Sequence, residues 1–208
     1  MKNEQIYIIS DVHGCYKTLL ALIEQFPNKQ NSKIVFVGDL VDKGNNSYEV
    51  IEFIMNNNYD CVIGNHDCYF VECCFDWAMF GWGQQTLKSY LSSEEMERHK
   101  NFLLKLPLYL EYKNYKTKDN RYLVVSHCAI SNFWDKRFVD SEKVNFFYNV
   151  TYNETERFDN KNIFNVYGSN SNEEIIISEY DASLIWSNLQ LCALEFPSME
   201  IYTQENIE

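Results

Sequence analysis

The chain has 208 residues, of which 46% are hydrophobic, and a formal net charge of −12. A chain of this length and hydrophobic content can bury one sizeable core, so we expect a single domain over residues 1–208. The acidic balance argues against nucleic-acid binding, because affinity for the phosphate backbone depends on clustered Lys and Arg.

No apolar run approaches the roughly 20 residues that a membrane-spanning helix needs. The first ten residues lack the charged start, long apolar centre and cleavage site of a signal peptide. The seven cysteines are odd in number and show no Cys-x-x-Cys spacing, which is typical of reduced core cysteines rather than of disulfides or a zinc knuckle. We therefore expect a cytoplasmic protein.

The first half of the chain alternates short apolar runs with amphipathic segments. Runs of four or five apolar residues predict strands, and apolar residues three or four positions apart predict helices. The expected elements are strand 5–10, helix 15–26, strand 33–37, helix 47–56, strand 60–63, a helical region over 69–91 interrupted at 81–83, and helix 93–105. Ser92 and Glu95 form a capping box for the last helix. His99, between Arg98 and Lys100 on that charged helix, is expected at the surface.

The second half is richer in strands. A strand begins at Leu108, the polar stretch 114–121 is a predicted hairpin connection, and residues 132–162 are poorly patterned. Further strands are expected at 121–126, 163–167, 175–178, 189–196 and 199–203, the last two joined as a hairpin around Pro197-Ser198. The order predicts an α/β arrangement at the front of the chain and a strand-rich region behind it.

Four of the predicted strands end in polar residues that can bind a metal or carry a proton. The segments that follow these strands are Asp11-Val12-His13-Gly14, Gly38-Asp39-Leu40-Val41-Asp42-Lys43-Gly44, Gly64-Asn65-His66-Asp67, and His127 directly after Ser126. Open α/β sheets place their ligands at the carboxyl ends of strands. The convergence of four such ends predicts an enzyme.

These side chains suit a pair of divalent cations. Asp11 and His13 are two residues apart on an extended segment, so both can hold one ion. Asp39 has two oxygens and can bridge to a second ion, to which Asn65 and His127 offer an oxygen and a nitrogen. Two ions about 3.5–4 Å apart polarise a phosphoryl group and supply hydroxide at neutral pH. The mixed ligand set favours Mn first, with Fe, Zn, Ni or Mg as alternatives, over Ca.

A proton donor is also present in these segments. His66 is a candidate general acid for the leaving-group oxygen, oriented by Asp42 in a His–carboxylate pair. Lys43 and Asn65 are candidates for substrate binding. Three of these residues also have a purely structural interpretation. Asp42 can cap the turn before Ser47, His66 can simply begin a helix, and Lys43 can be solvated.

The four segments resemble the successive sequence blocks of the calcineurin-like metallophosphoesterases. The similarity extends to Gln84–Tyr90 and Leu106–Glu111, and is greatest to bacterial and phage protein serine/threonine phosphatases and to symmetrical diadenosine tetraphosphatases. The resemblance implies an α/β (α+β) fold of two packed mixed β-sheets flanked by helices. It also implies a dimetal site at the carboxyl ends of the central strands.

The chain departs from this family pattern in three places. Lys43 stands where the family has Arg, so a cation remains but the bidentate fork that grips phosphate is absent. The segment 147–150 lacks a second substrate-gripping Arg. Ser169, after Gly168, stands where the family has the last His ligand of the second ion; Asn170 or water would have to replace it, or the ion binds weakly.

Two functions from different classes follow. The first is a metal-dependent phosphoesterase, similar to a protein phosphatase, that hydrolyses phosphomonoesters on phosphorylated proteins through a metal-bound hydroxide. The alternative within the same class is a nucleotide hydrolase similar to a diadenosine tetraphosphatase. The second is a phosphatase-derived binding module with weakened turnover. The intact pair of His66 and Asp42 argues against the binding module, which has no use for a proton donor.

Overall fold

The computed structural model describes residues 5–72, 81–140, 148–149, 151, 157–168, 174–184 and 190–208. Within these ranges the strands form two five-stranded sheets. The first sheet has the order β10 (Glu200–Glu205), β9 (Gln190–Phe196), β1 (Ile6–Ile9), β2 (Lys33–Phe36) and β3 (Asp60–Cys61). The second has the order β4 (Tyr109–Lys116), β5 (Tyr122–Ser126), β6 (Ile163–Tyr167), β8 (Asp181–Ser183) and β7 (Ile176–Ile177).

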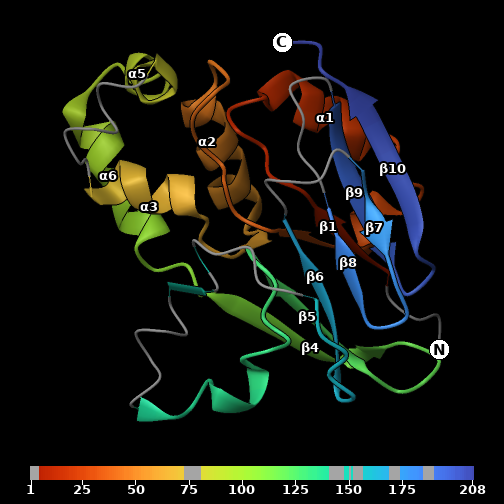
Figure 1. Ribbon diagram of the computed structural model, residues 1–208. Helices are drawn as coiled ribbons and strands as arrows, with labels where there is room; N and C mark the ends of the chain where they lie inside the picture. The colour runs from red at the N-terminus through yellow and green to blue at the C-terminus, as the bar shows by residue number, and fades with distance from the viewer. Residues whose placement is uncertain are drawn as a thin grey trace.

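Both sheets are mixed. In the first, β1, β2 and β3 are parallel, whereas β9 runs antiparallel to β1 and β10 antiparallel to β9. In the second, β5, β6 and β8 are parallel, with antiparallel β4 and β7 at the edges. The carboxyl ends of the parallel strands β1, β2, β3 and β5 carry the four polar segments of the sequence (Figure 1).

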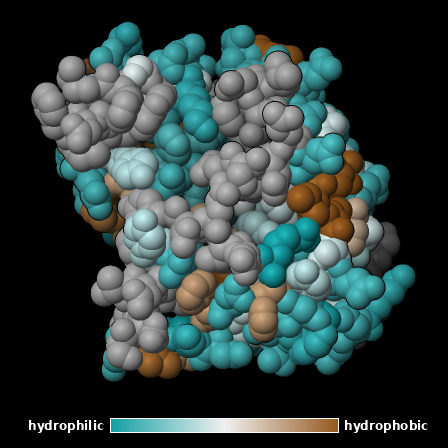
Figure 2. Space-filling view, in the orientation of Figure 1, coloured by the Kyte–Doolittle hydropathy of each residue, from teal (hydrophilic) through white to brown (hydrophobic). Residues whose placement is uncertain are grey.

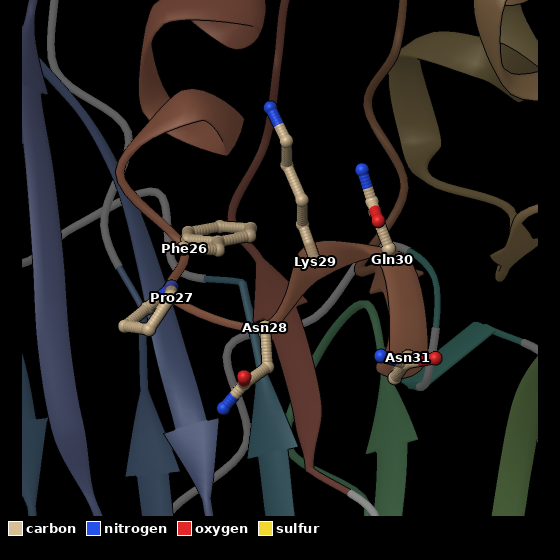
Figure 3. Close-up of a pocket in the computed structure, with 6 residues that line it drawn as sticks. All are labelled: Phe26, Pro27, Asn28, Lys29, Gln30 and Asn31. Carbon is tan, nitrogen blue, oxygen red and sulfur yellow. The ribbon is translucent and has the colours of Figure 1, made fainter.

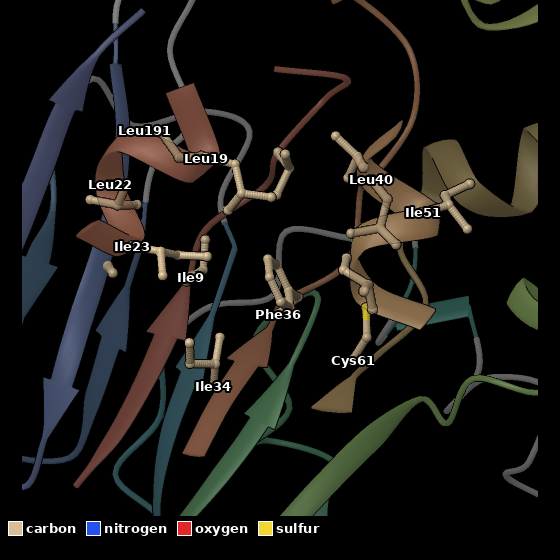
Figure 4. Packing of buried hydrophobic residues seen from close by; sticks show 14 of the residues in the cluster. Ile9, Leu19, Leu22, Ile23, Ile34, Phe36, Leu40, Ile51, Cys61 and Leu191 are labelled. Carbon is tan, nitrogen blue, oxygen red and sulfur yellow. The ribbon is translucent and has the colours of Figure 1, made fainter. Parts of the chain in front are cut away.

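Strand β1 is buried on both of its faces, and its alternating side chains build two separate cores. Tyr7 and Ile9 pack with α1 (Tyr16–Glu24) and α2 (Ser47–Asn57), as Figure 4 shows for Ile9 beside Leu19 and Leu22. Ile6 and Ile8 face the other way, into the core shared with β5, β6 and β8 of the second sheet. The molecule is therefore layered as helices, first sheet and second sheet.

Three further helices, α3 (Asn65–Glu72), α5 (Gly81–Lys88) and α6 (Ser93–Leu103), follow β3 and lie beside α2 (Figure 1). Short 3₁₀ turns occur at Lys29–Asn31 and Trp134–Lys136. One half of the predicted capping box is present, because the Ser92 hydroxyl accepts a bond from the Glu95 backbone N–H at 3.2 Å. No helix of the described residues is long and apolar enough to cross a membrane.

Several element boundaries differ from the prediction. The interruption expected at 81–83 is wrong, because α5 begins at Gly81. β4 continues to Lys116, so the predicted connection 114–121 shortens to a tight turn in which the Asn120 N–H donates to the Thr117 carbonyl. Strand β8 was not predicted, since three residues are too few to show a period.

The surface position expected for His99 is also wrong. Its side chain is fully buried, with Tyr90 Oη 2.9 Å from Nδ1 and Glu52 Oε1 2.6 Å from Nε2. Successive residues of a helix point about 100° apart. Arg98 therefore reaches solvent while His99 faces α2, and Lys100 lies over the Phe70 ring.

The described cysteines, at positions 15, 61, 68, 128 and 192, form no disulfide. The surface seen in Figure 2 is largely hydrophilic, with apolar side chains gathered only in small patches. A hollow of about 350 Å³ is lined by residues 26–31, which precede β2 (Figure 3). It lies at the amino end of that strand and offers no carboxylate or imidazole, so the candidate site lies elsewhere.

Candidate active site

The turns after β2 and β3 pack against each other so closely that only glycine fits. Gly38 has φ +95°, and a Cβ built on it would lie 2.6 Å from the backbone N of Gly64. A Cβ on Gly64 would lie 2.2 Å from Asp39 Oδ1. These contacts hold the Asp39 carboxylate against the segment that begins α3.

Three carboxylate oxygens at this point are buried and lack a hydrogen-bond partner among the described residues. They are both oxygens of Asp11, which is 1% exposed, and Oδ2 of Asp39, which is fully buried. An unpaired buried carboxylate is costly. Burial, reinforced by the nearby charge of Asp39, raises the pKa of Asp11 well above its usual range. These oxygens are in the condition expected of metal ligands.

Two imidazole rings face the same oxygens. His13 Nδ1 lies 2.8 Å from the Val41 carbonyl, and His127 Nδ1 lies 2.9 Å from the Val37 carbonyl. A carbonyl oxygen can only accept, so each Nδ1 carries a proton; in the neutral form of such a ring the lone pair is on Nε2. Metal-bound histidines are oriented by the same kind of bond.

The Nε2 atoms of both rings face Asp39. His13 Nε2 is 3.5 Å from Asp39 Oδ2, and His127 Nε2 is 3.5 Å from Asp39 Oδ1. Asn65 Oδ1 lies 3.0 Å from His127 Nε2, which places two acceptor atoms side by side. A shared cation would satisfy both of them. Burial lowers the pKa of His13 well below its usual value, so its ring is in the neutral form that binds metals.

The structure thus brings Asp11, His13, Asp39, Asn65 and His127 together, from the ends of four different strands. The donor set fits divalent ions of the Mn, Fe or Zn type better than Ca, because it mixes oxygen with imidazole nitrogen. In addition, atoms of the His13, Asp39 and His66 side chains lie within 4.8 Å of one another.

The predicted pair of His66 and Asp42 is formed. His66 Nδ1 lies 2.7 Å from Asp42 Oδ2, and the backbone N–H of His66 donates to Asp39 Oδ1 at 2.9 Å. Burial lowers the pKa of His66, but the carboxylates of Asp39 and Asp42 more than offset this, and the net shift is upward. His66 is therefore held in a form that can donate a proton.

Lys43 faces this cluster. Its Nζ lies 2.9 Å from His13 Nε2. Burial lowers the pKa of Lys43, although the carboxylates of Asp39 and Asp11 oppose that shift. The side chain is half-buried, and whether it meets the substrate or solvent stays a prediction.

Two residues that the sequence did not single out also take part. Asp67 is fully buried, and its carboxylate accepts the backbone N–H groups of Asp39 (2.9 Å), Leu40 (2.9 Å) and Gly64 (3.0 Å). It ties the two glycine turns together; burial and the charge of Asp39 raise its pKa to about 7. Thr86 of α5 donates from Oγ1 to Asp42 Oδ1 at 2.6 Å. Asp67 and Thr86 both lie within the segments whose sequence resembles the metallophosphoesterase family. That resemblance was the sequence feature that could have identified them.

The remaining predicted positions, Ser169, Asn170, Phe147 and Val150, lie outside the described residues. Their neighbour Gly168 is described, and a Cβ on it would lie 2.4 Å from Asp11 Oδ1. The segment that leads into Ser169 therefore reaches the carboxylate cluster.

Known proteins resemble this chain in sequence and in fold. The sequence model of the family described as calcineurin-like phosphoesterase matches residues 5–195. The chain is 30% identical over 136 residues to a symmetrical bis(5'-nucleosyl)-tetraphosphatase of Erwinia tasmaniensis, a match covering 62% of this chain and 46% of the relative. It is 28% identical over 137 residues to the enzyme of the same description from Buchnera aphidicola subsp. Baizongia pistaciae, covering 62% and 45%. The chain thus spans less than half the length of these relatives.

Solved structures share the fold over the whole chain. A structure provisionally assigned as a diadenosine tetraphosphatase superposes with a TM-score of 0.70 at 19% identity, covering 100% of this chain and 96% of the other. A metallophosphoesterase from Sphaerobacter thermophilus superposes with a TM-score of 0.61 at 16% identity, covering 98% and 88%. With two mixed sheets, strand-end carboxylates and imidazoles, and a family match over residues 5–195, this chain belongs to the calcineurin-like phosphoesterase family.

Proposed function

We propose that the chain is a phosphoesterase that works with two divalent metal ions, manganese first among them. The observation that carries the proposal is the set of three buried, unpartnered oxygens of Asp11 and Asp39. The lone pairs of His13 and His127 point at the same place. Such an arrangement destabilises the metal-free protein and is stabilised when cations bind.

Asp11, His13 and Asp39 would hold one ion, and Asp39, Asn65 and His127 the other. When bound, the two ions would polarise the phosphoryl group and make an attacking hydroxide available at neutral pH.

The chain's own residues supply the proton. As the oxygen of water forms its bond to phosphorus and the bond to the leaving oxygen breaks, His66 gives its proton to that oxygen. Asp42, 2.7 Å from His66 Nδ1, holds the ring in the orientation that this donation needs. Lys43 offers the phosphate a single positive charge, in place of the two parallel hydrogen bonds that an arginine would make.

A nucleotide with a phosphoanhydride bond, such as a dinucleoside polyphosphate, is the substrate class that we propose first. The support is the similarity to enzymes named as symmetrical bis(5'-nucleosyl)-tetraphosphatases. The phosphoprotein substrate expected from the sequence is the second candidate, because a single lysine suits an exposed phosphomonoester that the protein need not grip tightly.

The test compares diadenosine tetraphosphate, a phosphoserine peptide and 4-nitrophenyl phosphate as substrates of chelator-treated protein supplied with Mn²⁺. We expect Mn²⁺-dependent hydrolysis, fastest with the dinucleotide, and a loss of about 10²–10⁴-fold in His66→Asn. Titration calorimetry of the variant with Mn²⁺ separates two roles: unchanged metal affinity supports a proton donor, and weakened affinity indicates a ligand. If no substrate is hydrolysed above blank with any of Mn²⁺, Fe²⁺, Zn²⁺, Ni²⁺ or Mg²⁺, the binding module is the correct function.

A further inference from the structure

The hydroxyl of Thr86 lies at the centre of a buried set of bonds around Asp42. Thr86 is fully buried on α5, 44 residues along the chain from Asp42. Its Oγ1 lies 2.6 Å from Asp42 Oδ1, 2.9 Å from the Asp42 backbone N and 3.3 Å from Ser47 Oγ. Backbone, carboxylate and hydroxyl groups of three segments therefore meet at one atom.

Counting protons fixes the direction of each bond. The carboxylate oxygen can only accept and the backbone N–H can only donate, so Thr86 gives its single proton to Asp42 Oδ1 and accepts from the Asp42 N–H. The Ser47 hydroxyl must then be the donor to the remaining lone pair of Thr86. All the hydrogen-bonding capacity of the Thr86 hydroxyl is used, which is what a buried hydroxyl requires.

These bonds hold both parts of Asp42. The backbone of Asp42 has φ 72°, a conformation that is unfavourable for a residue with a Cβ and persists only where the surroundings impose it. Its side chain has one oxygen bound to Thr86 and the other 2.7 Å from His66 Nδ1. The carboxylate therefore cannot rotate away from the imidazole without breaking the bond to Thr86.

A second hydroxyl, on Ser89 directly after the end of α5, makes a different contact. Ser89 Oγ donates to the Thr86 carbonyl at 2.7 Å and accepts the backbone N–H of Tyr48, in the first turn of α2, at 3.2 Å. Ser89 attaches α5 to α2 without touching Asp42. It is thus the natural control for Thr86.

We infer that Thr86 is a positioning residue, which through Asp42 aims the imidazole of His66 at the leaving-group oxygen. The inference rests on the proposed function. The water oxygen bonds to phosphorus, the electron pair of the broken bond stays on the leaving oxygen, and the proton of His66 neutralises that oxygen. Thr86 itself exchanges no proton with the substrate.

The test uses two aryl phosphates with the Mn²⁺-loaded full chain. Phenolate is a poor leaving group that needs the proton, whereas 4-nitrophenolate leaves readily without it. For Thr86→Val, which keeps the shape but not the hydroxyl, we expect kcat on phenyl phosphate to fall about 10–100-fold. On 4-nitrophenyl phosphate the fall should be about threefold or less. Thr86→Ser should restore both rates to within about threefold, and Ser89→Ala should lower the melting temperature without changing the ratio of the two rates.

A second readout does not depend on turnover. The His66 Nδ1 proton, bound to a carboxylate, should give a downfield proton NMR signal, assigned by its loss in His66→Asn. We expect the signal to survive in Thr86→Ser and Ser89→Ala and to disappear in Thr86→Val. If Thr86→Val does not fold, Thr86→Cys, with a weaker donor, takes its place in both measurements.

The outcomes separate the two proposals. If the native protein hydrolyses neither these esters nor diadenosine tetraphosphate, the proposed function fails. In that case, and also if only the dinucleotide is hydrolysed, the NMR signal decides the role of Thr86. An unchanged signal in the valine variant, or equal losses on the two esters, would overturn the inference. A lost signal together with a selective loss on phenyl phosphate supports it.

Discussion

Asp11 makes it possible to detect metal binding as a gain in thermal stability. Its carboxylate is 1% exposed, and neither oxygen has a hydrogen-bond partner in the described part of the chain. Because burial and the charge of Asp39 raise its pKa well above the usual value, the ionised group destabilises the metal-free fold near neutral pH. We predict that Mn²⁺ raises the melting temperature and that Asp11→Asn removes most of this increase.

The size of the effect can be worked out. At a free metal concentration 100 times the Kd, one bound ion adds about 2.7 kcal/mol to the free energy of unfolding. For a chain of 208 residues, this corresponds to a rise of about 5–11 °C. In the variant, an amide replaces a buried unpaired carboxylate, whose burial costs at least about 1–3 kcal/mol. The metal-free variant should therefore be no less stable than the native protein.

The assay is scanning calorimetry of chelator-treated native protein and Asp11→Asn, each with and without Mn²⁺. The control variant is Asp60→Asn. Asp60 bonds Lys33 and Tyr112, away from the metal candidates, so this variant should melt at a lower temperature yet keep the full rise with Mn²⁺. Equal rises in native protein and Asp11→Asn, or no rise in the native protein at millimolar Mn²⁺, would refute the reasoning.

Three further predictions concern single residues. Lys43→Arg should lower KM for phosphate esters about 3–10-fold, because a guanidinium binds phosphate with two parallel bonds; an unchanged KM would show that this side chain does not meet the substrate. Ser169→His, which follows Gly168 at the carboxylate cluster, should tighten Mn²⁺ binding in titration calorimetry, and no change would mean that this position is not a ligand position. His99→Ala removes a buried, hydrogen-bonded ring and should cost about 2–4 kcal/mol in urea unfolding without altering Mn²⁺ affinity; a loss below about 1 kcal/mol would contradict the burial described above.

Much of the candidate site was predictable because its signals are local. At Asp11-x-His13 and at Gly64–Asp67, a buried apolar strand is followed directly by polar residues. A few consecutive residues therefore indicate both the strand and the candidate ligands. The same locality explains why the helices 16–24, 47–57 and 93–103 were predicted nearly to their ends. The predicted pairing of Asp42 with His66 is present, 24 residues apart, although no short window shows it.

The residues that sequence reasoning missed depend on contacts between distant segments. His99 looked exposed because its neighbours are charged, yet its partner Glu52 lies 47 residues away on α2. Asp67 looked like an ordinary helix residue, and its bonds to Asp39 and Leu40 span 28 and 27 residues. A pattern of neighbours carries no information about such partners.

Local sequence is enough to show which side chains stand at the strand ends, since apolar runs, glycine turns and polar residues are consecutive along the chain. Packing established which of them share a space, which nitrogen of each imidazole faces Asp39, and which oxygens lack a hydrogen-bond partner among the described residues. The physical reason is that hydrogen bonds and burial depend on atoms brought together by packing two sheets and their helices. The protonation of His13, fixed by the Val41 carbonyl 28 residues away, shows that dependence at a single atom.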